Sequence, residues 1–167
     1  ITCRDWSSDV CSSDLVNRGV ARFAVEGGAI RYGLAAIKGV GESAVELLVR
    51  QREAGGAYSS VEDLCHRCDT HLVNKRVIEA LAKAGAFDEI EPSRRSAFER
   101  ADAAIASAAG IHRDAQRGQT SLFGNLAEVA PAQRPEVTSE DWLPEESLAR
   151  EKEVLGGYLS GDRKSVV

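Results

Sequence analysis

A pair of glycines two residues apart constrains this chain more than any other feature. They lie in the stretch Ile37-Lys38-Gly39-Val40-Gly41-Glu42-Ser43-Ala44, between a short apolar segment and a helical pattern. Gly39 and Gly41 can adopt backbone angles closed to other residues, and they leave no side chain in the way of an approaching surface. The amides of the turn and of the next helix's first turn then point outward unpaired, which suits phosphate. The stretch therefore predicts either an ordinary tight turn between helices or a turn that holds an anion.

Patterns around the turn predict a mainly α-helical fold with a small N-terminal β-hairpin. Residues 16–32 are predicted to form a strand, a turn and a second strand, with the turn at Glu26-Gly27-Gly28. A short apolar helical turn is expected at 33–37, and a helix from about Glu42 to Glu53. Scarce aromatic residues (5%) and abundant alanine favour helices over a sheet core.

Capping residues mark the helices that follow. Ser60 and Asp63 have capping-box spacing. Asn74 precedes an apolar stripe that ends at Gly85, and Ser93 precedes a longer stripe that is expected to end at Gly110. The order helix, glycine turn and apolar residue occurs twice between residues 33 and 90. We therefore expect these residues to form one module whose two hairpin-like halves bury a shared core. The first half resembles the helix-hairpin-helix motif, which grips the DNA backbone without reading bases.

The overall charge limits how the chain can meet nucleic acid. A formal net charge of −5 argues against coating DNA by bulk electrostatics, whereas a contact made by backbone amides needs no basic surplus. Among the basic residues, Lys38 inside the turn is the best candidate for a phosphate partner. The others are expected to form a solvated helix face: Arg50, Arg52, Lys75, Arg76 and Lys83.

Several classes of function and compartment are not favoured. Cys65-His66-Arg67-Cys68 lacks the second ligand pair that zinc usually needs, so a structural role is expected and no metal or cofactor is assigned. No paired acids or nucleophile–base set stands out, which predicts a non-catalytic segment. No apolar run approaches a membrane span, there is no secretory signal pattern, and cysteines without framework spacing suit a reducing cytoplasm.

The segment 115–144 is expected to be a flexible linker that carries a binding peptide. It is rich in proline and acids and has little periodicity. Leu122 and Phe123 lie side by side within it, and Gln119 precedes them. Exposed apolar residues in a polar segment are costly unless something buries them. Two interpretations remain open: the pair packs on the chain's own helices, or it anchors a partner, as does the Gln-x-x-Leu-Phe peptide that bacterial replication proteins use to hold the sliding clamp.

The two ends do not resemble protein sequence. Residues 5–15 and 162–167 back-translate into matches to the two adaptors used in short-read sequencing. We therefore expect 1–15 and 162–167 to be adaptor artefacts, and the natural chain to be a piece of a larger gene product.

Five blocks in fixed order resemble the bacterial C-family replicative polymerases, the DNA polymerase III alpha subunits. They are Ile30 to Gly41, Val73 to Leu81, Lys83 to Asp88, Gly118 to Gly124, and Glu151 to Gly161. The resemblance covers about Val16 to Gly161, and five blocks together are far more specific than any one of them.

The resemblance implies a division of the chain and a role for each part. The expected segments are the end of the fingers (16–32), a tandem helix-hairpin-helix module (33–90), a long helix (91–114), a linker with a clamp-binding peptide (115–144) and a helix leading toward a missing barrel domain (145–161). It implies duplex DNA, the sliding clamp and other holoenzyme subunits as partners. DNA contact falls on Lys38, Gly39, Val40, Gly41, Glu42 and Ser43, and clamp contact on Gln119, Leu122 and Phe123.

The parent protein would be a Mg²⁺-dependent DNA-directed DNA polymerase, and this piece, without the catalytic palm, would be inactive alone. Three alternatives stay open. They are a stand-alone, non-catalytic helix-hairpin-helix DNA-binding or adaptor protein, the error-prone damage-tolerance paralogue within the family, and a purely structural helical domain.

Overall fold

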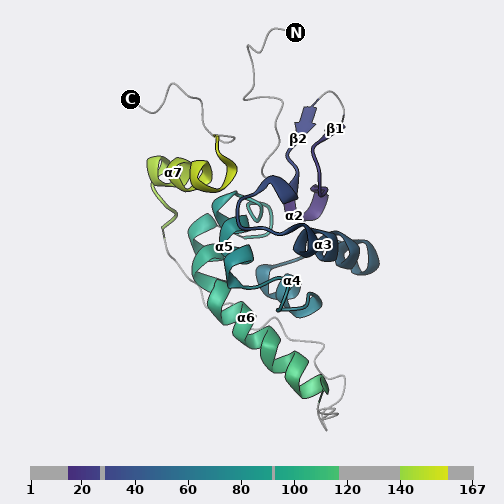
Figure 1. Cartoon of the computed structure of the whole chain (residues 1–167). Coiled ribbons are helices and arrows are strands. Elements are labelled where there is room, and N and C mark those ends of the chain that lie inside the picture. Colours follow the sequence, from purple (N-terminus) through teal and green to yellow (C-terminus); the bar gives the residue numbers. More distant parts are fainter. Residues whose placement is uncertain (1–14, 27–28, 92, 117–139, 158–167) are drawn as a thin grey trace.

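The computed structural model describes residues 15–26, 29–91, 93–116 and 140–157. Helices make up most of this part, with one short two-stranded sheet at its N-terminal side (Figure 1). In chain order the elements are α2 (Leu15–Arg18), β1 (Ala24–Glu26), β2 (Ala29–Arg31), the 3-10 turn η1 (Leu34–Ala36), α3 (Glu42–Gly55), α4 (Val61–Arg67), α5 (Lys75–Lys83), α6 (Arg94–Gln116) and α7 (Pro144–Leu155).

The two strands pair antiparallel, with Ala24 opposite Arg31 and Glu26 opposite Ala29. The prediction that this strand pattern begins at residue 16 was wrong, because residues 15–18 form α2. Tertiary contacts select this conformation. The Val16 side chain is buried in the core, and the Asn17 side chain exchanges two hydrogen bonds with the backbone of Tyr58, at 2.7 and 3.1 Å.

Helix starts follow the predicted caps. The Ser60 hydroxyl accepts from the Asp63 amide at 3.1 Å, and the Asn74 side chain accepts from the Val77 amide at 3.3 Å. After α5 the chain reverses at Gly85, whose φ of 74° is the left-handed conformation that glycine adopts without strain. These caps set the lengths of α4 and α5 from local chemistry alone.

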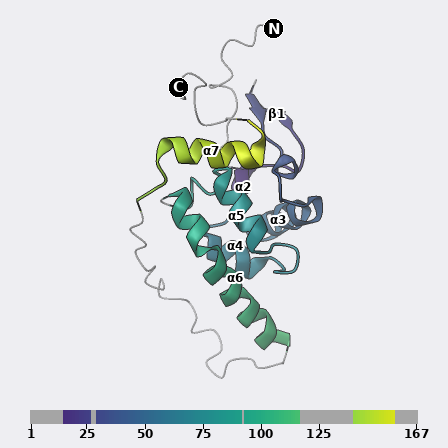
Figure 2. The ribbon, with the colours of Figure 1, turned by 60° about the vertical axis from the view of Figure 1, so that its left-hand side comes forward.

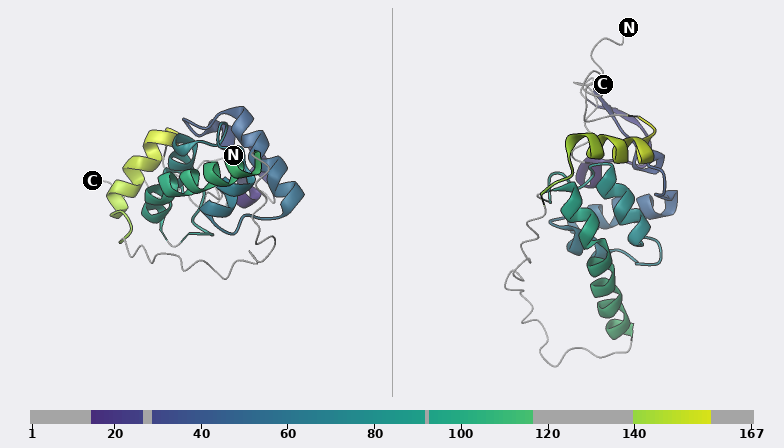
Figure 3. Two further views of the ribbon diagram at one scale, coloured as in Figure 1. Left: turned by 90° about the horizontal axis from the view of Figure 1, so that it is seen from below. Right: turned by 90° about the vertical axis from the view of Figure 1, so that its left-hand side faces the viewer.

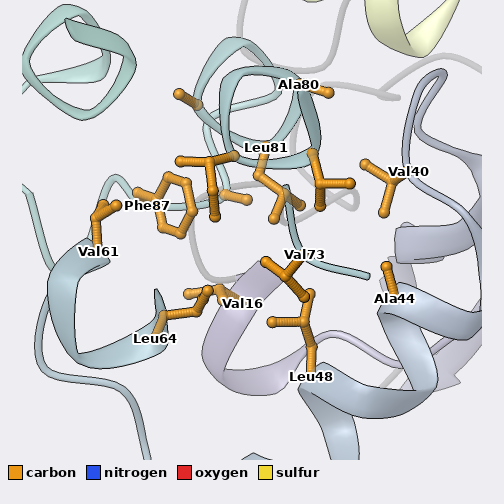
Figure 4. Close-up of a cluster of buried hydrophobic side chains, with 14 of the residues drawn as sticks. Val16, Val40, Ala44, Leu48, Val61, Leu64, Val73, Ala80, Leu81 and Phe87 are labelled. Carbon is orange, nitrogen blue, oxygen red and sulfur yellow. The ribbon is translucent and has the colours of Figure 1, made fainter. Parts of the chain in front are cut away.

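A single hydrophobic core joins segments that the sequence patterns had separated. Side chains from α2, the glycine turn, α3, α4 and α5 meet in its centre (Figure 4). Helix α6 packs along α4 and α5 through a stripe of fully buried alanines, Ala97, Ala101, Ala104 and Ala108. These small side chains let the helices approach closely. The module around the turn is therefore completed by α6, and Val154 of α7 belongs to the same cluster.

The prediction that Gly110 ends the long helix was wrong, because α6 continues to Gln116. Glycine inside a helix costs about 1 kcal/mol relative to alanine, which does not break a helix whose next residues are compatible with it. The distal part of α6 extends beyond the other helices (Figure 3), and Ile111 there is half exposed.

Helix α7 lies across the end of the module near the β-hairpin (Figure 2). It starts with Pro144, a favoured first helical residue, and closes at Gly156, whose φ is 73°. Among the described residues, no helix combines the length and apolarity needed to cross a bilayer.

Candidate nucleic-acid interface

The glycine turn is a tight reversal whose geometry depends on Gly39. The Val40 amide donates to the Ile37 carbonyl at 3.0 Å, and Gly39 between them has a φ of 95°. This is the third position of a type II turn, where glycine is favoured because a Cβ would be strained. Gly41 is different: its φ of −77° and ψ of 151° are extended backbone that any residue adopts.

Two side chains anchor the turn to the core. Ile37 and Val40 are buried, with 1% and 6% of their surface exposed. Ala80 of α5 packs beneath the reversal, because a Cβ built on Gly39 would lie 3.7 Å from the Cβ of Ala80. With its apolar side chains turned inward, the turn keeps its outer backbone at the surface.

The predicted DNA-contact residues divide into two groups by burial and hydrogen bonding. Val40 is buried, and its amide is used inside the turn. Lys38 is exposed, but its amide donates to the Val154 carbonyl of α7 at 2.8 Å. Gly39, Gly41, Glu42 and Ser43 are exposed. The amides of Lys38 and Val40 are therefore not available to a ligand.

The amides of Glu42 and Ser43 form the start of α3. The first α-helical hydrogen bond runs from the Val45 amide to the Gly41 carbonyl, so the earlier amides lie outside the helical ladder. Gly41 is the N-cap and has no side chain with which to cap them. Within the described ranges, no acceptor takes the amides of Glu42 or Ser43. These two donors lie at the positive end of a 14-residue helix, an arrangement that can accept an anion.

The charges around these amides are mixed. Arg22, in the loop before β1, places its guanidinium 3.8 Å from the Glu42 carboxylate, and both side chains are largely exposed. The Lys38 side chain is exposed on the turn itself. Arg22 was not among the predicted residues, because only the packing of the loop beside α3 brings it to the turn and no local pattern signals that proximity. An incoming phosphate would be flanked by Arg22 and Lys38 and would compete with Glu42 for Arg22.

Most other basic residues of the module have structural partners. The Arg52 guanidinium donates to the carbonyls of Val16 and Gly19, at 3.2 and 2.8 Å. Lys75 pairs with Asp102 and Glu79, and Lys83 with Glu153 at 3.0 Å. Carboxylates thus offset the charges of Lys75 and Lys83, whereas Arg52 is bound by neutral carbonyls.

The predicted clamp-binding residues Gln119, Leu122 and Phe123 lie outside the described residues. So does the predicted turn residue pair Gly27-Gly28 of the β-hairpin.

Cys65 and Cys68 are buried thiols next to Tyr58. The Tyr58 hydroxyl donates to the Leu48 carbonyl at 2.7 Å and lies 3.7 Å from the Cys68 sulfur. The histidine between them, His66, contacts the Ser107 hydroxyl at 3.1 Å. In the part of the chain that the structure describes, no three His, Cys, Asp or Glu side chains converge as a metal site would need.

Burial makes the stability of the fold sensitive to alkaline pH through Cys65. Burial, followed by the neighbouring Cys68 and Glu62, raises the pKa of the Cys65 thiol from 9.0 to about 12. Below pH 9 both folded and unfolded chains keep this proton. Between pH 9 and 12 the unfolded chain loses it more readily, so the free energy of unfolding falls with a slope of up to about 1.4 kcal/mol per pH unit from this thiol.

Urea unfolding at pH 7 to 10.5 measures this effect, with Cys65→Ala as the control. The variant lacks the titrating group and is expected to lose less stability over the same interval. Equal pH dependence of the two chains would show that the Cys65 thiol is not the group responsible.

The fold and the exposed amides at the start of α3 define a class of protein. A family model described as helix-hairpin-helix motif matches residues 10–97, just over half of the chain, and the chain belongs to this family. It is similar to proteins named DNA polymerase III subunit alpha. Identity is 38% over 161 residues to that of Vibrio cholerae, 43% over 147 residues to that of Caulobacter vibrioides and 39% over 149 residues to that of Escherichia coli K12.

These matches cover 87–95% of this chain but only 13–14% of each relative. The chain therefore spans a small part of the length of the curated relatives it matches.

Proposed function

We propose that this chain is the DNA-holding region of a replicative DNA polymerase alpha subunit. In this role it binds duplex DNA independently of the base sequence and attaches the polymerase to a sliding clamp. The observation that carries the DNA-binding part is the pair of exposed amides of Glu42 and Ser43 behind a glycine N-cap, at the end of a helix. Support for the polymerase context comes from relatives at 38–43% identity that are named as DNA polymerase III subunit alpha.

The contact with DNA uses the backbone of the protein and the backbone of the duplex. The Glu42 and Ser43 amides donate to the oxygens of one phosphate, and the absence of a Cβ on Gly41 lets that phosphate approach. Lys38 and Arg22 supply positive charge on either side. Because no base edge is read, affinity does not depend on sequence, and it falls as salt rises. This local arrangement suits a chain whose net charge is −5.

Nucleotide transfer belongs to other parts of the parent protein. Polymerases of this kind use Mg²⁺ held by acidic side chains, which supplies charge stabilisation to the transferred phosphate. The acids in the described segments do not fit such a site, because no three of them converge.

Attachment to the clamp is assigned to Gln119, Leu122 and Phe123. Gln119 follows the last residue of α6, Gln116, by three positions in the sequence. Two weak attachments to one substrate raise the effective local concentration of DNA.

Gly41→Val tests the DNA contact. The extended backbone at Gly41 accepts valine, and the nearest atom to the new Cβ is the Ser43 hydroxyl at 3.9 Å. Its methyl groups would obstruct the approach to the Glu42 and Ser43 amides. We expect a loss of about tenfold in affinity for two duplexes of unrelated sequence, measured by fluorescence anisotropy at 25 °C. Valine is also a poorer N-cap than glycine, so a loss of affinity could come from a loss of helix. Circular dichroism of the variant verifies that the chain is folded.

Gly110→Val is the matched control, since Gly110 lies in the distal half of α6 with open space around it. It is expected to bind both duplexes as the unchanged chain does. Affinity within twofold for Gly41→Val, or an equal loss in both variants, would show that DNA is held elsewhere.

A further inference from the structure

The C-terminal end of α7 is in direct contact with the glycine turn. The Val154 carbonyl accepts from the Lys38 amide at 2.8 Å, and the Leu155 carbonyl accepts from the Tyr32 hydroxyl at 3.1 Å. Carbonyls in the last turn of a helix have no partner within the helix. At α7 these two acceptors are satisfied by Lys38 within the turn and by Tyr32, which precedes η1, so the end of the helix supports the turn.

A buried ion-pair network holds α7 in this position. Glu151 is fully buried, and its carboxylate lies 3.0 Å from the Arg94 guanidinium at the start of α6. The other nitrogens of Arg94 contact both carboxylate oxygens of Asp88, at 2.7 to 3.1 Å. A buried carboxylate is very costly unless it is paired, so α7 cannot shift away from Arg94 without a large penalty.

The residue of α7 that pairs with Arg94 and the residue that contacts the glycine turn lie on the same side of the helix. Glu151 and Val154 are three residues apart, which puts them on the same helix face about 4.5 Å apart along its axis. Trp142 reinforces the other end of this segment. It is buried, packs edge-on against Phe98 of α6 at 5.6 Å, and lies under the Arg150 guanidinium at 4.2 Å. The position and rotation of α7 are thus set by contacts with α5 and α6, and they determine where the Val154 carbonyl meets Lys38.

We infer that α7 is a positioning element for the DNA-binding turn, and that Arg94 and Glu151 are positioning residues that act through it. This inference rests on the proposed function of the turn. Docked α7 holds Lys38 by its amide next to Gly39, the residue at which the chain reverses. When α7 is undocked, the Lys38 amide loses its acceptor and the first half of the turn loses one of its supports. Duplex affinity therefore depends on an ion pair that makes no contact with DNA.

The experiment compares a broken pair with a repaired one in the full chain carrying Trp6→Phe, so that fluorescence reports Trp142 alone. Arg94→Met removes the guanidinium that pairs with the buried Glu151 carboxylate. We expect Trp142 emission to shift to longer wavelength and duplex affinity at 25 °C to fall at least threefold. Arg94→Met combined with Glu151→Leu and Asp88→Asn removes all three charges of the network, a change that is often neutral for stability. Both the emission and the affinity are expected to return to within twofold of the starting chain.

Arg95→Met is the matched control, because Arg95 is an exposed neighbour whose guanidinium pairs with Glu99 on the same helix. It is expected to change neither readout. If Arg94→Met does not fold, Glu151→Gln provides a milder break with the same expected direction. Exposed Trp142 with unchanged affinity would overturn the inference and leave the proposed function standing. Unchanged affinity of Gly41→Val would instead overturn the proposed function.

Discussion

Leu122→Ala combined with Phe123→Ala is expected to abolish binding of this chain to a bacterial sliding clamp. Each residue would fill a pocket as an apolar anchor, and truncation of such anchors commonly costs 2 kcal/mol or more. Together they should lower affinity at least 100-fold, which corresponds to about 2.7 kcal/mol. Isothermal titration of the clamp with the two chains measures the difference.

Leu126→Ala is the control for this double variant. It removes a leucine from the same stretch of sequence but outside the Gln119-to-Phe123 spacing, and should leave affinity unchanged. Gln119→Ala should have an intermediate effect, because a hydrogen bond at the pocket rim contributes less than a buried side chain. Affinity within twofold for the Leu122 and Phe123 double variant would remove the clamp from the proposed function and leave the DNA contact unaffected.

Gly33→Ala is expected to destabilise the fold severely, although its backbone angles are ordinary. Gly33 has a φ of −77° and ψ of 128°, which alanine adopts easily. A Cβ there would lie 2.7 to 2.9 Å from backbone atoms of Arg22 and Phe23. Backbone cannot rotate away as a side chain does, so the segment before β1 must move. The Leu34 and Ala35 amides donate to the Val20 and Ala21 carbonyls of that segment, at 2.9 and 3.1 Å. We expect a loss of roughly 2–4 kcal/mol in the free energy of unfolding.

Gly41→Ala is a closely matched control, since Gly41 has the same φ of −77° but open space around it. It should change the free energy of unfolding by no more than about 1 kcal/mol, from the weaker N-cap. Urea denaturation of the three chains gives the comparison. Equal stability of Gly33→Ala and Gly41→Ala would show that the close approach of residues 22–23 to Gly33 does not constrain the fold.

Local patterns were sufficient to predict most of the helices. The caps at Ser60 and Asn74 and the reversal at Gly85 were correct, because each depends on a side chain or backbone angle within a few residues. The apolar stripe predicted after Ser93 was also correct, because its spacing places the buried alanines on one face of α6. Two boundaries were wrong for different reasons. Gly110 lacks the positive φ that would end a helix, and Val16 is drawn into the core by distant contacts.

At the candidate site, too, local sequence determined some features and distant contacts determined others. A glycine pair followed by a helical pattern was enough to predict a turn with bared amides, since glycine conformation and helix-end geometry are local properties. Which amides stay free was not local. The Lys38 amide is taken by Val154, a residue far along the chain, and Arg22 reaches the site only because its loop packs beside α3.

Short-range chemistry thus specified the helices, their caps and the glycine turn of this protein. Long-range packing selected α6 as part of the module, docked α7 on the turn through a buried ion pair, and divided the predicted contact residues into buried and available ones. The physical reason is that a hydrogen bond between residues close in the sequence depends only on the local order of those residues. Burial depends on which surfaces pack together, and this is determined only when segments distant in the sequence form one core.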